Sequence, residues 1–238
     1  MTRPTLVFIH GFMGDPSDWD FVRKQFPDHV TVTPTIRAAT DWSSGIKQLA
    51  EEIPHNAVLV GYSMGARLSM GLMSTIAERI SGLFFVSGNP GIEDREIAGK
   101  RYQNDCRIAE RIEREPRSDF LSFWYSESTV FQSLTDRVRE DEIRRKSARG
   151  DDDWATILRC FSVGLQPNYW PALPDMKVPF WAIAGMADLK YTNIILKMGR
   201  VPQITPRVVP HCGHIVHREQ PHVFVTLLRR FLATHGFN

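Results

Sequence analysis

Short apolar runs alternate with amphipathic stretches along the first part of the chain. Four of these runs have the length and composition of buried parallel strands, and they are Thr5–His10, Val30–Thr33, Ala57–Val60 and Gly82–Ser87. Between them, apolar residues recur at helical spacing in Trp42–Ile53 and Ala66–Ile80. This alternation of strand and helix predicts a parallel sheet with helices on both faces.

The rhythm breaks between about Glu93 and Leu173, where the chain is rich in Arg, Glu and Asp and shows no convincing strand. This segment predicts several short helices, among them Asp94–Glu115 and Thr135–Ser147. Further on we predict a strand, a helix, a strand and a helix, at Pro179–Ala184, Thr192–Met198, Arg207–Val209 and Pro221–Thr234. The prediction is therefore one α/β core of residues 1–92 and 174–238, with a helical cap of residues 93–173 inserted after the fourth strand.

Composition narrows the range of partners. The 238 residues suffice for one such domain, and 42% hydrophobic and 24% charged residues are ordinary for a soluble protein. A net charge of +2 gives no basic field for nucleic acid. No apolar run approaches the roughly 18 residues that span a bilayer. We expect a small-molecule partner, no nucleic acid, no membrane span, and a monomer or weak homo-oligomer.

Cysteine usage and the start of the chain predict the compartment. The three cysteines, Cys106, Cys160 and Cys212, are widely spaced and match neither a disulfide framework nor a zinc pattern. The first strand begins almost directly after Met1, so we expect no signal peptide. The expectation is a cytoplasmic protein with reduced thiols and no metal.

The strongest chemical motif is Gly61-Tyr62-Ser63-Met64-Gly65, which fits the pattern G-x-S-x-G. The motif follows a predicted strand directly and precedes a predicted helix, as a nucleophile elbow requires. Glycines are needed there because the turn is strained and brings helix and strand close together. We predict that Ser63 projects from the top of the sheet at a helix N-terminus. The structural alternative is a serine that only caps the helix.

An acid and a histidine follow two later strands. Asp188 comes just after the strand that ends near Ala184, and His214 lies between the last strand and the last helix. The chain order Ser, Asp, His is that of the α/β-hydrolases, and each of the three residues follows a different strand. We therefore predict an α/β-hydrolase fold with a mostly parallel sheet and a catalytic triad, in which His214 accepts the proton of Ser63 and Asp188 fixes the His214 tautomer.

The oxyanion site follows from the same geometry. The predicted donors are the backbone N–H groups of Met64, directly after the nucleophile, and of Phe12, in the loop after the first strand. We expect His10 to shape that loop rather than to take part in catalysis.

The cap suggests the class of substrate. Arg67 lies one helical turn after Ser63, and Arg101 and Arg149 lie in the cap. Guanidinium groups beside an oxyanion site suggest a substrate with more than one carboxylate, with aromatic walls from Trp124-Tyr125 and Phe131. The alternative is that cap arginines form a solvated face with neighbouring Glu and Asp residues.

Motifs along nearly the whole chain resemble one family of this fold. They are His10-Gly-Phe-Met-Gly14, Gly61-Tyr-Ser-Met-Gly-Ala-Arg67, Ser87-Gly-Asn-Pro-Gly-Ile92, Phe120-Leu-Ser-Phe-Trp-Tyr125, Phe131-Gln-Ser-Leu134, Asp188-Leu-Lys-Tyr191 and Gly213-His-Ile-Val-His-Arg-Glu219. The family is that of the 2-succinyl-6-hydroxy-2,4-cyclohexadiene-1-carboxylate synthases of menaquinone biosynthesis. The cap motifs are its specific part, because triad motifs occur throughout the superfamily. One departure is that the early edge strands of the superfamily are absent or very short here.

The resemblance implies elimination of pyruvate, a lyase reaction, rather than hydrolysis. Ser63 would act as a base once His214 has deprotonated it, and would remove a ring proton α to the succinyl ketone. The family's carboxylate-binding arginines fall on Arg67, Arg101 and Arg149, and its cap tryptophan falls on Trp124. Tyr62 would line the same pocket. No metal or organic cofactor is implied, because the substrate's ketone accepts the electrons.

Two other classes of function stay open at this level. A carboxylesterase or thioesterase with an acyl-Ser63 intermediate would use the same triad and oxyanion site, although neutral esters need no inward arginines. A non-catalytic binding or signalling protein of this fold is the third reading, and the complete triad argues against it.

Overall fold

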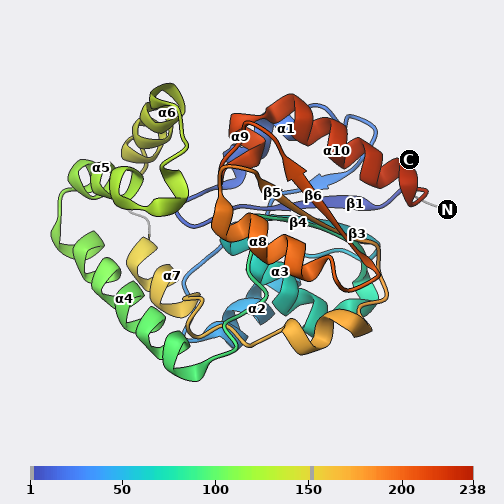
Figure 1. The fold of residues 1–238 in the computed structure, drawn as a ribbon, viewed down its shortest axis with the longest axis horizontal. Coiled ribbons are helices and arrows are strands. Elements are labelled where there is room, and N and C mark those ends of the chain that lie inside the picture. The colour runs from blue at the N-terminus through green and yellow to red at the C-terminus, as the bar shows by residue number, and fades with distance from the viewer. Residues whose placement is uncertain (1–2, 151–152, 238) are drawn as a thin grey trace.

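Six strands form one central sheet in the computed structural model, which describes residues 3–150 and 153–237. Their order is β2-β1-β3-β4-β5-β6, and every neighbouring pair is parallel (Figure 1). The strands are β1 (Thr5–Ile9), β2 (Thr31–Val32), β3 (Ala57–Tyr62), β4 (Ile80–Val86), β5 (Phe180–Gly185) and β6 (Ile204–Val209). The predicted parallel sheet is confirmed, and a strand of only two residues, β2, lies at one edge.

Helices cover both faces of this sheet, as the alternation of elements predicts. The helices are α1 (Asp20–Arg23), α2 (Trp42–Glu51), α3 (Met64–Thr75), α4 (Arg95–Arg114), α5 (Arg117–Glu127), α6 (Asp136–Ser147), α7 (Trp154–Cys160), α8 (Leu189–Met198), α9 (Val216–Glu219) and α10 (Pro221–Thr234). In Figure 1, α1 and α10 lie on one side of the sheet, and α2, α3 and α8 lie on the other.

The two faces belong to separate apolar clusters. In β1, Leu6 and Phe8 pack in the cluster that includes α10, whereas Val7 and Ile9 pack in the cluster that includes α2, α3 and α8. Successive side chains of a strand point to opposite faces, so a strand that is apolar throughout needs helices on both sides.

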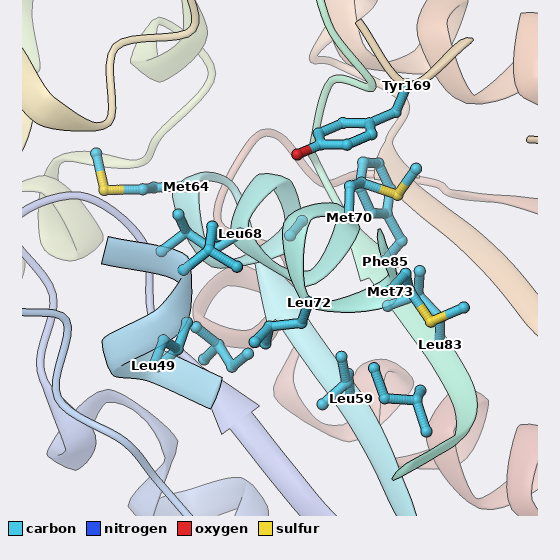
Figure 2. Packing of buried hydrophobic residues seen from close by; sticks show 14 of the residues in the cluster. Leu49, Leu59, Met64, Leu68, Met70, Leu72, Met73, Leu83, Phe85 and Tyr169 are labelled. Atoms are coloured by element: carbon cyan, nitrogen blue, oxygen red, sulfur yellow. The ribbon is translucent and has the colours of Figure 1, made fainter. Parts of the chain in front are cut away.

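Helix α3 is held firmly between the sheet and α2. Its residues Leu68 and Leu72 are fully buried, and Figure 2 shows them beside Leu49 of α2 and Leu59 of β3. Each buried leucine contributes roughly 1.5–3 kcal/mol to stability. This packing fixes the position of the N-terminus of α3, and therefore of the residue that precedes it, Ser63.

Three predicted elements miss one end by three residues or more. The strand predicted over Arg207–Val209 begins at Ile204, and the helix predicted over Thr192–Met198 begins at Leu189. The helix predicted over Ala66–Ile80 ends at Thr75, a 3-10 turn follows, and Ile80 already begins β4. The chain leaves helical geometry at Ile76, whose φ is −135° and ψ 40°. Apolar spacing missed this boundary because both Ile76 and Ile80 are buried and happen to continue the helical period.

Between Glu93 and Leu173 the described residues form helices, 3-10 turns and loops but no strand. Helices α4 to α7 gather at one side of the sheet (Figure 1). Treating 93–173 as a separate cap domain stays a prediction. No helix within the described part of the chain is long and apolar enough to cross a membrane.

Buried charges join α6 to the core. Glu142 is buried and accepts hydrogen bonds from Lys146 at 2.6 Å and from Arg218 of α9 at 3.1 Å. Arg145 reaches across to Asp18 at 2.8 Å. Removing one partner of such a buried pair typically costs about 3–5 kcal/mol, because the other charge is left unpaired. These pairs therefore hold α6 close to the loop that carries His214.

His217 of α9 is buried beside this junction and packs as an aromatic ring. It stacks on Trp19 with ring centroids 4.3 Å apart and planes 24° apart, and it meets Tyr62 edge-on at 4.7 Å. Burial lowers the pKa of His217 to about 3, so the ring is neutral in the folded protein at neutral pH.

We expect this neutral histidine to make stability fall on acidification. Below about pH 6.5 the unfolded chain binds a proton at His217, whereas the folded chain binds it only near a pH of about 3. The free energy of unfolding then drops by about 1.4 kcal/mol per pH unit from this group alone. Replacing His217 with phenylalanine keeps an aromatic ring and should flatten the pH dependence measured by urea unfolding.

The matched control for that experiment is His55→Gln, since His55 is exposed and its replacement should leave the slope unchanged. Equal slopes for the His217→Phe variant and the wild type would contradict a neutral, buried His217.

Candidate active site

Ser63 occupies the sharp turn between β3 and α3, as the elbow motif predicts. Its φ is 52° and its ψ −107°, a strained combination for a residue with a side chain that costs about 1–3 kcal/mol. A Cβ on Gly61 would lie 2.6 Å from the carbonyl oxygen of Gly65, and a Cβ on Gly65 would lie 2.1 Å from that of Ile9. Both positions therefore require glycine, and the turn holds Ser63 above the strand ends.

Ser63, His214 and Asp188 form one hydrogen-bonded chain. His214 Nε2 lies 3.1 Å from Ser63 Oγ, and His214 Nδ1 lies 2.6 Å from Asp188 Oδ2. A carboxylate can only accept, so Nδ1 carries the proton and Nε2 is free to accept the serine hydroxyl. The structure thus brings the three residues predicted from sequence together, with His214 and Asp188 both buried.

Asp188 is fixed from its other side by the helix that it begins. It is the N-cap of α8, and its Oδ1 accepts the backbone N–H of Tyr191 at 3.3 Å. The Tyr191 ring lies 4.7 Å from that of His214. The N-cap hydrogen bond and the ring contact therefore hold Asp188 and His214 in position.

Phe12 and Met64 lie where oxyanion donors are predicted. Both line the cavity next to Ser63. Met64 is the first residue of α3, so its N–H has no acceptor within the helix. His10 anchors the Phe12 loop, because its Nδ1 donates to the carbonyl of Gly11 at 2.8 Å and its Nε2 accepts the N–H of Ile36 at 3.2 Å. Burial lowers the pKa of His10, in keeping with a neutral, structural ring.

A cavity of about 440 Å³ opens above Ser63 and His214. Its lining mixes apolar and aromatic side chains with polar and charged ones. Its lining residues include Phe12, Tyr62, Ser63, Met64, Arg67, Arg101, Asp105, Ile108, Phe123, Trp124, Phe131, Lys190, Tyr191 and His214. Residues of the segment 93–173 and of the rest of the chain both contribute to this lining.

Arg67 is a buried cation in this cavity. Its side chain donates to Gln166 Oε1 at 3.2 Å and lies over the Trp42 ring at 5.9 Å. Burial, together with the charge of nearby Arg101, lowers the pKa of Arg67 to about 10. An anion arriving in the cavity would relieve this unfavourable burial.

Arg101 lines the same cavity but is held differently. Its Nε donates to Asp105 Oδ1 at 2.8 Å, while Asp105 Oδ2 accepts from Ser162 at 2.7 Å. Asp105 is buried, whereas the Arg101 side chain is 35% exposed. The pairing aims one edge of the guanidinium at Asp105 and leaves its remaining donors for a ligand.

Of the four aromatic residues predicted for the pocket, Tyr62, Trp124 and Phe131 line the cavity. Tyr62 is buried with its ring 5.4 Å from His214, and burial raises its pKa well above the usual value, so the phenol stays neutral. Trp124 packs edge-on against Phe12 at 5.7 Å. Phe131, also from the cap, meets His214 edge-on at 5.7 Å.

Two sequence expectations need correction. Arg149 is not among the residues that line this cavity. It lies by a neighbouring hollow, where it donates to the carbonyl of Met13 at 2.9 Å and pairs with Asp15 at 2.9 Å. Tyr125 points away, with its hydroxyl 3.4 Å from Glu142. Tyr125 lies on α5 and Arg149 lies in the loop after α6, and spacing in the chain does not reveal which way either side chain points.

Sequence reasoning missed several polar residues at or beside the cavity, among them Asp105, Gln166 and Lys190. Asp105 positions Arg101, Gln166 contacts Arg67, and Lys190 lines the wall beside Tyr191. Lys190 belongs to the motif Asp188-Leu-Lys-Tyr191, so its charge two residues after Asp188 could have indicated a place at the site. Gln166 is 99 residues away from Arg67 along the chain, and nothing local marks it.

Comparisons with known proteins agree with this architecture. The chain matches the model of the Alpha/beta hydrolase family over residues 6–227. It is 31% identical to the 2-succinyl-6-hydroxy-2,4-cyclohexadiene-1-carboxylate synthase of Salmonella agona, covering 96% of this chain and 94% of the relative. The enzyme of the same name from Klebsiella pneumoniae is 29% identical, over 97% and 94%.

Among solved structures, MenH from S. aureus superposes with a TM-score of 0.91 and 24% identity. The match covers 99% of this chain and 96% of that one. At this identity the likeness shows the shared fold.

Proposed function

Since the chain belongs to the alpha/beta hydrolase family and, within it, to the 2-succinyl-6-hydroxy-2,4-cyclohexadiene-1-carboxylate synthases, we propose that it acts as their lyase. The substrate is 2-succinyl-5-enolpyruvyl-6-hydroxy-3-cyclohexene-1-carboxylate, and the products are pyruvate and the cyclohexadiene. The observation that carries the proposal is one cavity that holds both a Ser63–His214 base and two arginines.

The reaction begins with proton transfer. His214 Nε2 accepts the hydroxyl proton of Ser63, and the serine oxygen removes the ring proton α to the succinyl ketone. Asp188, bonded to Nδ1 at 2.6 Å, stabilises the imidazolium that forms. The electron pair of the broken C–H bond moves onto the ketone oxygen, and the N–H groups of Phe12 and Met64 stabilise this oxyanion.

Elimination completes the turnover. The negative charge returns to the ring and forms a C2=C3 bond, the existing C3=C4 bond shifts to C4=C5, and the bond from C5 to the enolpyruvyl oxygen breaks. The imidazolium of His214 returns its proton to the departing enolate, which becomes pyruvate. The substrate's ketone serves as the electron sink, so the proposal includes no cofactor.

Arg67 and Arg101 bind carboxylates of the substrate in this proposal, and Tyr62 and Trp124 contact its ring. Arginine suits this task because its donors match a carboxylate in pairs. Arg149 has no place in this set, because it lies by the neighbouring hollow. The substrate class is therefore a small polycarboxylate.

The competing proposal is a serine carboxylesterase or thioesterase with an acyl-Ser63 intermediate. It would use the same triad and the same oxyanion donors. Burial lowers the pKa of Arg67 to about 10. This buried cation favours the anionic substrate, because a neutral ester would leave it uncompensated.

The direct test supplies the enolpyruvyl-succinyl-cyclohexene carboxylate and follows pyruvate with lactate dehydrogenase and NADH. We expect one pyruvate per substrate consumed, and much slower hydrolysis of p-nitrophenyl acetate in parallel. Rapid ester hydrolysis without pyruvate would establish the esterase instead.

The proposal also covers the cellular compartment and the oligomeric state of the enzyme. We place it in the cytoplasm as a monomer or weak homo-oligomer that binds no nucleic acid. A net charge of +2 and three widely spaced cysteines support this placement.

A further inference from the structure

The loop that carries His214 is held by a carboxylate from five residues further along the chain. Glu219, the last residue of α9, accepts the N–H of Gly213 at Oε2 and the N–H of Ile215 at Oε1, both at 2.8 Å. One side chain therefore binds the residue before the histidine and the residue after it.

This arrangement fixes the direction in which His214 points. The Gly213 N–H belongs to the Cys212–Gly213 peptide unit and the Ile215 N–H to the His214–Ile215 unit, so bonding both restrains the backbone around the histidine. A third bond runs from Ser87 Oγ to the carbonyl of His214 at 2.9 Å. Gly213 and Ile215 are buried, so an amide left without an acceptor there would cost about 1–3 kcal/mol.

The chemistry of the clamp calls for a carboxylate. Two N–H donors need two acceptor oxygens on one planar group, and glutamate provides them. Glutamine has one oxygen and would turn its NH₂ group toward the second N–H donor. Burial raises the pKa of Glu219 above its usual value, and the N–H groups of Gly213 and Ile215, together with nearby His214, act against that rise.

We propose that Glu219 is a positioning residue for His214, which clamps the Gly213 and Ile215 amides so that Nε2 stays in reach of Ser63. The inference rests on the proposed function for its kinetic readout. It extends the triad by a residue that touches neither Ser63 nor the substrate. A displacement of about 1 Å in a catalytic group is enough to lower turnover about 100-fold.

The test replaces Glu219 with glutamine and measures pyruvate release together with the low-field proton resonance of the His214–Asp188 hydrogen bond. We expect kcat to fall by about 10- to 100-fold with KM within about twofold, because Arg67 and Arg101 are untouched. The resonance should shift or broaden. Thermal unfolding checks that the Glu219→Gln variant is folded. If it is not, the test uses Glu219→Asp, which keeps the charge on a shorter side chain.

Glu113→Gln is the matched control. Glu113 also accepts on both carboxylate oxygens, from Arg159 at 2.5 and 2.8 Å, but it lies on α4 of the cap segment. This variant should behave as the wild type. Unchanged kcat and resonance in Glu219→Gln would overturn the inference, as would a fall in kcat without any change in the resonance. A wild type that releases no pyruvate while the Glu219→Gln resonance shifts would overturn the proposed function and leave the clamp standing.

Discussion

Replacing Ser63 with alanine is expected to lower kcat for pyruvate release by about 10⁴-fold or more. The hydroxyl is the group that His214 meets at 3.1 Å, and alanine leaves the substrate proton without a base. KM should change little, because the arginines and aromatic walls of the cavity remain. Steady-state kinetics with the coupled pyruvate assay measures both parameters.

A matched serine on the same helix controls for general damage. Ser74 of α3 donates to the carbonyl of Met70 at 3.1 Å and lies at the end of the helix opposite to Ser63. Its alanine variant should keep wild-type turnover. Pyruvate release by Ser63→Ala at even a tenth of the wild-type rate would rule out the serine as the base, and would point to direct proton abstraction by His214.

Replacing Arg67 with methionine is expected to lower kcat/KM for the anionic cyclohexene by about 100-fold or more, since a charge-assisted hydrogen bond in a buried site contributes about 2–4 kcal/mol. Methionine retains the apolar stem that packs in the cavity. Arg101→Ala should cost less, about tenfold, because the Arg101 side chain is 35% exposed and water screens its charge.

Replacing Arg67 should affect pyruvate release and ester hydrolysis differently. Hydrolysis of p-nitrophenyl acetate needs no carboxylate partner, so it should be unaffected by Arg67→Met. The control is Arg159→Met, which removes a cap arginine paired with Glu113 and should leave both activities intact. Pyruvate release that survives in Arg67→Met with unchanged kcat/KM would show that the substrate carboxylates bind elsewhere.

Most strands and helices follow from short-range patterns, and this is why they could be predicted. The apolar run of β3 is buried at every position, and the helix predicted over Pro221–Thr234 has those limits in the structure. The end of α3 was missed because the buried residues that follow the helix continue its apolar spacing. Element type was therefore decided locally, whereas the end of α3 and the starts of α8 and β6 were not.

The triad was predictable for a related reason. Parallel strands end at the same edge of a sheet, so polar residues that directly follow different strands are brought together by topology alone. Ser63, Asp188 and His214 each follow a different strand, and no knowledge of packing was needed to group them. The glycines of the elbow added a local signal, because a Cβ on Gly65 would lie 2.1 Å from the Ile9 oxygen and a Cβ on Gly61 would lie 2.6 Å from the Gly65 oxygen.

The sequence by itself therefore determined the sheet, the order of its elements and the three residues of the triad. Tertiary structure alone decided which charges face the cavity. Arg67 and Arg101 line it, but Arg149 turns to Met13 and Asp15, and Glu219 turns back onto the amides beside His214. The physical reason is that a long side chain reaches several partners from one backbone position, and packing between distant segments selects among them.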